Sequence, residues 1–150
     1  MVTETTDREI GSTRTFEAPR ALVWKVWTDP DHLAHWWGPN GFTITTKKFE
    51  LKEGGEWLFT MHGPDGTDYR NEITFTLLAE PEKLEYDHRP APFFHTTVTF
   101  EEESVDRTKL TMTAVFTTKE ERDRTVEKFN AVEGMKQTLG RLGEYLSSME

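Results

Sequence analysis

The chain lacks cysteine, is poor in basic residues and contains no long apolar run, and each absence excludes a class of protein. Without cysteine, neither a disulfide bond nor a thiolate zinc site can form. There are 18 lysines and arginines against 27 aspartates and glutamates, so the net charge is -9. Nucleic acids and anionic membranes bind through clustered basic side chains, and Lys47-Lys48 is only an isolated pair. We therefore expect neither as a partner.

The absence of long apolar segments also bears on location. No run approaches the roughly 20 residues that span a bilayer, and residues 1–7 are polar and acidic, without a signal-peptide core. We therefore expect a cytoplasmic protein without membrane insertion. We expect residues 1–8 to be flexible and residues 9–150 to form one domain, because a chain of this length buries roughly 70% of its unfolded surface.

Large aromatic side chains carry much of the apolar content. Aromatic residues make up 12% of the chain, and two of the five tryptophans, Trp36 and Trp37, are adjacent. They stand at the end of a short predicted helix, directly before Gly38-Pro39. We expect one tryptophan to anchor this helix in the core and the other to line or gate a cavity. So short a helix leaves open which does which.

The hydrophobic pattern predicts a strand, two short helices, about six further strands and a long helix. Residues 9–17 alternate as a strand, and the short helices begin at Pro19 and near Pro30, since proline favours the first helical position. From Phe42 to Phe116 the period is two, which is typical of antiparallel strands with one wet face. The breaks between these strands are expected at 63–66, 81–83, 89–92 and the acidic run 101–103.

The C-terminal part of the chain predicts one continuous helix. Thr118 and Glu121 fit a capping box, and apolar residues then recur at steps of three or four from Val126 to Met149. Each glycine in a helix interior costs about 1 kcal/mol relative to alanine, so those present indicate close packing or a bend. Three glycines interrupt the stripe, at Gly134, Gly140 and Gly143.

These elements together predict an α+β fold in two layers. A single curved antiparallel sheet must bury one face, and only the long helix has the length to cover it. The two short helices then close one end of the sheet. An exposed sheet edge also allows a weak homodimer.

Several of these segments resemble a known superfamily. Phe16-Glu17-Ala18-Pro19 before Val23-Trp24, followed by Thr28-Asp29-Pro30 and Trp36, resembles the start of START-like (SRPBCC, helix-grip) domains. Residues 133–142 resemble the C-terminal helix of the branch similar to the C-terminal domain of the activator of the Hsp90 ATPase, with Met135 where tryptophan is usual. The resemblance covers about residues 9–148.

The resemblance implies a helix-grip fold, in which a curved sheet of six or seven strands wraps around the long helix and leaves a cavity between them. Members of the superfamily bind lipids, sterols, polyketides or other hydrophobic molecules, and some are cyclases, aromatases or hydrolases.

Strand parity, the apolar stripe of the long helix and the paired tryptophans predict which side chains face that cavity. They are either a ligand-binding lining or the filling of a core. Their mixture of aromatics, methionines and a few polar groups favours the lining. The candidate ligand-binding residues are Trp37, Trp57, Phe59, Met61, Tyr69, Asn71, Ile73, Tyr86, His88, Val98, Phe100, Met112, Met135 and Leu139.

His88 is the most informative titratable candidate. It shares a face with Leu84 and Tyr86 and could donate to a ligand oxygen or act as an acid or base near neutral pH. The alternative is a histidine at a strand end that is bonded to backbone or water. Asn71 on the neighbouring strand is its expected polar companion, and the phenols of Tyr69 and Tyr86 could orient a carbonyl or hydroxyl.

No metal site or cofactor is expected. His32 and His35 have a spacing that can bind metal, but Asp29 and Asp31 are better explained as helix-start residues. The chain contains no Gly-Xaa-Ser-Xaa-Gly elbow, phosphate-binding loop or dinucleotide fingerprint.

Three functional hypotheses follow from the sequence. The first is binding of a small hydrophobic or amphipathic molecule between the sheet and the C-terminal helix. The second is a polyketide cyclase/aromatase-like or hydrolase-like enzyme that uses the same cavity. The third is a protein-interaction module that acts on a chaperone or another partner.

Overall fold

A seven-stranded antiparallel sheet forms one layer of the molecule and the helices form the other. The computed structural model describes residues 6–90 and 93–149. The strand order is β1-β7-β6-β5-β4-β3-β2, so β2 to β7 form a meander and β1 adds beside β7. The elements are η1 (Thr6–Arg8), β1 (Glu9–Phe16), α1 (Arg20–Trp27), α2 (Pro30–Leu33), β2 (Thr43–Phe49), β3 (Glu56–His62), β4 (Asp68–Ala79), β5 (Lys83–Arg89), β6 (Phe94–Ser104), β7 (Arg107–Phe116), α3 (Lys119–Phe129) and α4 (Ala131–Ser148).

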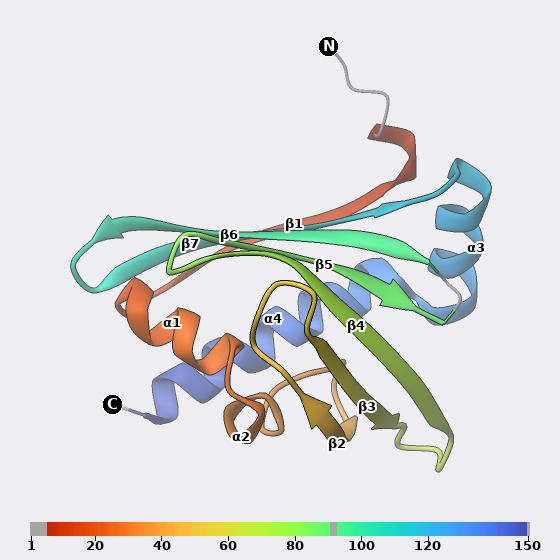
Figure 1. Ribbon diagram of the computed structural model, residues 1–150, viewed down its shortest axis with the longest axis horizontal. Helices are drawn as coiled ribbons and strands as arrows, with labels where there is room; N and C mark the ends of the chain where they lie inside the picture. Colours follow the sequence, from red (N-terminus) through yellow and green to blue (C-terminus); the bar gives the residue numbers. More distant parts are fainter. Residues whose placement is uncertain (1–5, 91–92, 150) are drawn as a thin grey trace.

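The helices all lie against the concave face of the sheet. Figure 1 shows α4 running beneath the strands, with α1 and α2 near one end and α3 near the other. The predicted α+β class and helix-grip arrangement are therefore confirmed. Within the described part of the chain, none of the helices is long and apolar enough to cross a membrane.

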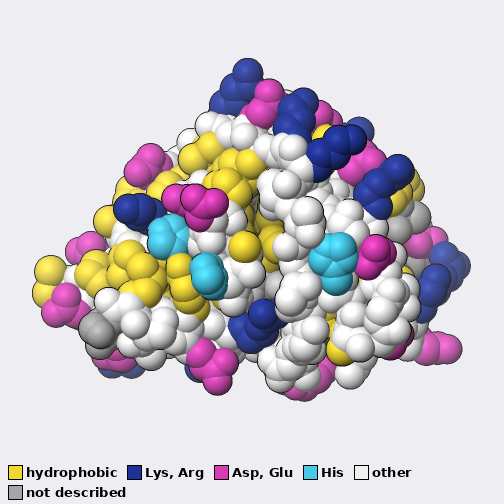
Figure 2. All heavy atoms as spheres, turned by 90° about the horizontal axis from the view of Figure 1, so that it is seen from below, with side chains coloured by type: hydrophobic (Ala, Val, Ile, Leu, Met, Phe, Trp, Pro, Cys, Tyr) yellow, Lys and Arg dark blue, Asp and Glu magenta, His cyan; other side chains and the backbone are white. Residues whose placement is uncertain are grey.

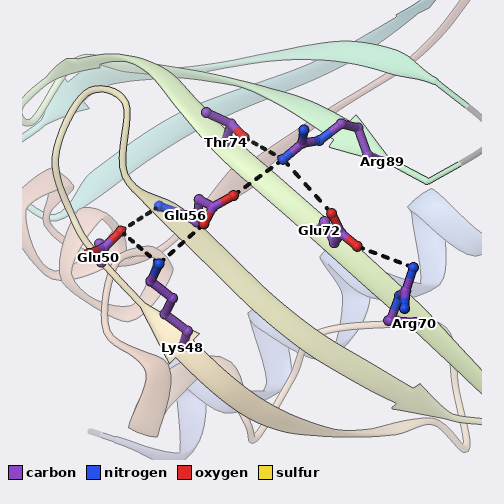
Figure 3. Close-up of polar contacts among 7 residues, drawn as sticks. All are labelled: Lys48, Glu50, Glu56, Arg70, Glu72, Thr74 and Arg89. Carbon is purple, nitrogen blue, oxygen red and sulfur yellow. Dashed lines mark hydrogen bonds and ion pairs between the residues drawn. The ribbon is translucent and has the colours of Figure 1, made fainter.

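The outer face of the sheet is polar, and part of it is a ladder of ion pairs (Figure 3). The Lys48 Nζ lies 3.2 Å from the Glu56 carboxylate, whose other oxygen lies 3.3 Å from the Arg89 guanidinium. Glu72 bridges Arg89 at 3.8 Å and Arg70 at 3.4 Å. Charged side chains of opposite sign thus face water across β2 to β5, and the apolar members of the same strands point to the concave side.

The side opposite the outer face mixes apolar and charged groups. Figure 2 views the molecule from below, the side on which Figure 1 places α2 and α4. Hydrophobic side chains reach the surface from the left edge toward the centre, and charged groups lie mainly toward the periphery.

The paired tryptophans have different surroundings. Trp36 is fully buried and its Nε1–H donates to the Val26 carbonyl at 3.1 Å. Its ring packs edge-on against Trp27 at 5.2 Å. Trp37 packs on Trp57 at 5.0 Å on the sheet side. Trp36 therefore anchors the short helix in the core, and Trp37 reaches the concave face of the sheet.

The C-terminal segment is two helices, so the prediction of one continuous helix is wrong. Its start agrees with the expected cap, since Thr118 Oγ1 accepts from the Glu121 N–H at 3.0 Å. Asn130 then takes a left-handed conformation with φ 51° and separates α3 from α4. Asparagine visits this region more readily than most residues. The apolar stripe continues at helical spacing through the break, so periodicity gives no sign of it.

Two glycines of α4 mark close packing against β1 rather than the bend. A Cβ placed on Gly143 would lie 3.4 Å from the Phe16 ring and 3.2 Å from the Arg14 guanidinium. At Gly140 the nearest contact would be the Arg14 guanidinium at 3.6 Å. The small residues thus let the helix approach the edge strand closely.

One turn prediction in the sheet is also wrong, and one strand contains a bulge that the sequence pattern did not predict. The acidic residues 101–103 continue β6, and the turn falls at Val105-Asp106, so the long hairpin extends beyond the core into water. In β4 the register shifts between Phe75 and Leu77. This bulge places Leu78, rather than Leu77, against the core.

The expected flexible N-terminus, residues 1–8, lies largely outside the described residues. Residues 6–8 form the short η1 turn, and the Arg8 guanidinium donates to the Phe116 carbonyl at 2.7 Å. The predicted loop 89–92 is described only as far as Pro90.

Candidate ligand-binding cavity

A cavity opens between the concave face of the sheet and the corner where α3 meets α4. It consists of an inner chamber of about 220 Å³ and an outer mouth of about 500 Å³. The two spaces adjoin, since several residues line both. The shared residues are Pro39, Met61, Asn71, His88, Phe94, Thr125, Phe129 and Gly134.

The inner chamber has apolar walls and few polar groups. Methionine, phenylalanine and isoleucine side chains from the strands face small residues of the helices, such as Ala131 and Gly134. Among the described residues, no lysine, arginine, aspartate or glutamate lines it. Its polar side chains are those of Asn71, Tyr86, His88, Thr96, Thr125 and Thr138.

The mouth is rimmed by aromatic and charged side chains. Tyr69 lies between Phe42, with ring centroids 6.1 Å apart, and Phe129, at 6.2 Å. Phe129 is 42% exposed, because α3 ends there and the chain turns at Asn130. The charged residues around this opening are Arg70, Lys128 and Glu133. An amphipathic molecule would meet charge only here, outside the inner chamber.

A hydrogen-bonded pair, His88 and Asn71, lies where the mouth meets the chamber. The Asn71 Nδ2 donates to the Tyr69 carbonyl at 3.0 Å, so its Oδ1 is the atom that accepts from His88 Nε2 at 2.5 Å. This hydrogen-bond pattern assigns the proton to Nε2, and a neutral ring then carries its lone pair on Nδ1. The imidazole also stacks on Phe94, with centroids 4.4 Å apart. The pair is thus held rigidly in the cavity wall.

A second polar pair, Tyr86 and Thr96, lies deeper in the chamber. The two residues are partners across β5 and β6, and both are almost fully buried. Burial raises the pKa of the Tyr86 phenol well above its ordinary value, and the nearby Thr96 hydroxyl offsets only part of that rise. Tyr86 therefore stays a neutral donor. Thr96 Oγ1 forms no hydrogen bond of good geometry with any described residue.

Most of the predicted site residues line this cavity. Tyr69 lies at the mouth. The others are found in the inner chamber, namely Trp37, Phe59, Met61, Asn71, Ile73, Tyr86, His88, Met112 and Met135.

Four predicted residues are packed in the core and do not line the cavity: Trp57, Val98, Phe100 and Leu139. Trp57 stacks on Phe59 at 4.0 Å, and Phe100 packs edge-on against Trp24 at 5.3 Å. Strand parity identifies the face of a side chain but not its position along the strand relative to the covering helices. Trp57, Val98 and Phe100 lie on strands where the helices fill the concave face, and Leu139 lies on α4 itself.

Several cavity residues were not predicted from the sequence. Phe94 and Thr96 share the parity of Val98, so the strand pattern itself could have identified them. Phe129 belongs to the apolar stripe of the C-terminal segment, so the helical period could have identified it, whereas Gly134 carries no hydrophobic signal. The unpredicted residues of the chamber are Ile10, Gly38, Pro39, Phe94, Thr96, Phe116, Thr125, Phe129, Ala131, Gly134 and Thr138.

The two histidines of the short helix lie away from this cavity. His32 Nδ1 lies 2.5 Å from the Tyr145 hydroxyl, and the His35 ring stacks on the Tyr145 ring at 5.1 Å. Both histidines therefore join α2 to the C-terminal end of α4.

Comparisons with known proteins agree with this architecture. A protein from Arthrobacter aurescens has a similar structure, with a TM-score of 0.89 and 29% identity over 98% of this chain and 90% of that chain. A protein from Nitrosomonas europaea matches with a TM-score of 0.86 and 25% identity over 96% and 97% of the two chains. An AHSA1 protein from Silicibacter pomeroyi shares the fold, with a TM-score of 0.76 and 18% identity over 95% and 99%.

The sequence also matches a family directly. No curated protein matches the chain significantly. The profile of the family described as Activator of Hsp90 ATPase homolog 1-like protein, by contrast, matches residues 17–147, which is most of the chain. The chain therefore belongs to the Activator of Hsp90 ATPase homolog 1-like family, and its helix-grip fold is that of the START-like (SRPBCC) superfamily.

Proposed function

We propose that this protein binds a small hydrophobic or amphipathic molecule in the cavity between the sheet and the α3–α4 corner. The observation that carries the proposal is an apolar chamber of about 220 Å³ that opens to solvent through an aromatic rim. Protein interiors are normally packed without voids of this size. Transfer of apolar ligand surface into the chamber gains roughly 25 cal/mol per Å².

The methionines provide a direct test of this proposal. Met61, Met112 and Met135 line the chamber, and Met149 is exposed at the end of α4. Decanol is titrated into protein with isotope-labelled methionine methyl groups, and the methyl signals are followed by NMR. The three chamber methyls should shift with saturation while Met149 stays unchanged. Equal shifts at all methionines, or no shift at all, would contradict the proposal.

A blocking variant gives an independent test. Gly134 lines both the chamber and the mouth, and a Cβ at this position would lie 3.4 Å from the Pro39 ring. Gly134→Leu should abolish decanol binding because the larger side chain occupies the opening. Gly134→Ala is the matched control, since it adds only the Cβ and should bind decanol normally.

An enzyme that uses this cavity is a second candidate, favoured by the position of His88 in the wall. Its bond to Asn71 and its stacking on Phe94 hold a titratable ring beside the chamber. Hydrolysis of a nitrophenyl butyrate ester measures such a reaction, and His88→Gln should abolish it. If the natural chain hydrolyses the ester no faster than the uncatalysed reaction proceeds, ester hydrolysis is ruled out.

Membership of the family supports a ligand-binding or chaperone-associated module in general terms. A chaperone-associated role would need an apolar docking surface. The exposed large hydrophobic residues lie on separate segments, at Leu51, Phe93, Val105, Phe129 and Met149. The ATPase rate of an Hsp90-type chaperone, measured with and without the protein, tests this role. Stimulation would support it.

Cytoplasmic location and a weak homodimer are part of the same proposal. β1 and β2 are the edge strands of the sheet, and each offers backbone groups to a second copy. Sedimentation over a range of protein concentrations should show a shift toward a dimer at high concentration. A concentration-independent monomer would exclude the dimer.

A further inference from the structure

We infer that the ligand carries a neutral oxygen-bearing group at its inner end, held by Thr96 and Tyr86, and that any anionic group stays outside at the mouth. This inference rests on the proposed binding function and names the class of ligand. A ketone, aldehyde, ester or alcohol with an apolar body meets the description.

The Thr96 hydroxyl is poorly satisfied within the protein. Its side chain is fully buried, lines the inner chamber and forms no hydrogen bond of good geometry with any described residue. Buried polar side chains are satisfied in the large majority of cases, and each exception calls for an explanation. A ligand oxygen in the chamber would supply the missing partner.

The phenol of Tyr86 lies beside this hydroxyl. Tyr86 pairs with Thr96 across β5 and β6, so the two hydroxyl-bearing side chains line the same wall. The phenol is neutral and can donate, and the Thr96 hydroxyl can donate or accept. Two hydroxyls of this kind match a carbonyl oxygen, which accepts two hydrogen bonds, or an alcohol, which both donates and accepts.

The inner chamber also lacks a positive charge among its described lining residues. The described lining of the inner chamber contains no lysine or arginine to neutralise a carboxylate. Moving an ionised carboxylate out of water without a counter-charge is strongly unfavourable. The basic groups near the cavity, Arg70 and Lys128, lie only at the mouth. His88, the imidazole in the wall, donates its Nε2 proton to Asn71. An acid would therefore be excluded from the inner chamber.

Three probes of equal chain length test the inference. Methyl octyl ketone, decane and decanoate are titrated at about pH 8, above the ordinary histidine pKa of about 6.5. Binding is read from the methyl signals of Met61, Met112 and Met135. The ketone should bind about 3–10-fold more tightly than decane, which is the worth of one ordinary hydrogen bond. Decanoate should bind more weakly than the ketone.

Variants then assign the effect to the two hydroxyls. Thr96→Val keeps the shape of the side chain and should lower affinity for the ketone about 3–10-fold. Affinity for decane should not fall. Tyr86→Phe should act in the same direction and serves as the second variant if Thr96→Val does not fold. Thr97→Val is the matched control, because Thr97 is the next residue on β6 and faces the outer side.

The outcomes separate the inference from the function on which it rests. If decanoate binds as tightly as the ketone, or if Thr96→Val and Tyr86→Phe leave ketone affinity unchanged, the inference is overturned and the binding function stands. If none of the three probes shifts the chamber methyls, both are overturned.

Discussion

The two ends of the concave face differ sharply, although the same strands supply both. At the end covered by α1 and α2, Trp27 packs edge-on against Trp36 at 5.2 Å and against Phe100 at 6.4 Å, and none of these three rings lines the cavity. At the end covered by α3 and α4, the sheet meets small or slender side chains such as Gly134 and Thr125, and the chamber remains.

The difference shows that the helices, rather than the sheet, decide where the cavity lies. Inward parity is unbroken along β6 from Thr96 to Phe100. Phe100 and Thr96 both point inward from β6, yet one is packed in the aromatic core and the other lines the chamber. The segment that contains α1 and α2 brings three tryptophans to its end of the concave face, namely Trp24, Trp27 and Trp36.

The largest expected effect comes from opening the filled end. Trp36→Ala removes a fully buried ring and its hydrogen bond to the Val26 carbonyl, and should lower the free energy of unfolding by about 3–5 kcal/mol. Urea denaturation measures the loss. Phe129→Ala at the cavity mouth is the control, since its ring is 42% exposed and should cost less than about 1 kcal/mol. Equal losses would contradict the difference between the two ends.

Adding volume should have opposite consequences at the two ends. Ala18 and Ala114 are both buried, but only Ala114 lines the chamber. Ala18→Leu overpacks the filled end and should cost about 1–3 kcal/mol of unfolding free energy. Ala114→Leu occupies empty space, so stability should stay within about 1 kcal/mol while decanol binding is lost. A large loss of stability in Ala114→Leu would mean that the chamber cannot accept the added atoms.

The buried phenol should make the hollow end sensitive to alkali. Because the pKa of Tyr86 is raised in the folded state, the neutral form is favoured there. Its contribution to stability is fully present below the unfolded pKa of about 10 and is lost as pH rises toward the folded value. Above about pH 10, the free energy of unfolding of the natural chain should fall by about 1.4 kcal/mol per pH unit more than that of Tyr86→Phe. If the free energies of unfolding of the two proteins fell equally with rising pH, water would reach the phenol.

The smallest effect is expected on the outer face, which both ends share. Arg89 bridges the carboxylates of Glu56 and Glu72 in the ladder of Figure 3. The Arg89 side chain is 45% exposed, so Arg89→Gln should cost only about 0–1 kcal/mol, and less at high salt. Decanol affinity should not change. An altered affinity would show that the outer face influences the cavity.

Much of the fold was predictable because its signals are local. Residue types at short spacing identified the Thr118 cap, the proline at the start of α2 and the alternating strands. The bulge between Phe75 and Leu77 and the left-handed Asn130 leave no mark in the hydrophobic period, since each involves a single residue. The error in helix length followed from Asn130.

The candidate site was predictable only in part. Parity correctly brought Met61, Asn71, Tyr86 and His88 to one surface, where the structure places them around the cavity. Parity equally selected Phe100, which the structure places in the aromatic core.

By itself, the sequence determined the order of the elements, the inward face of the strands and the amphipathic character of the C-terminal segment. These follow from backbone geometry, in which strands repeat every two residues and helices every 3.6. Only the tertiary structure decided which end of the concave face is filled and which stays open. That outcome depends on the summed volume of side chains from distant segments, which no local period contains.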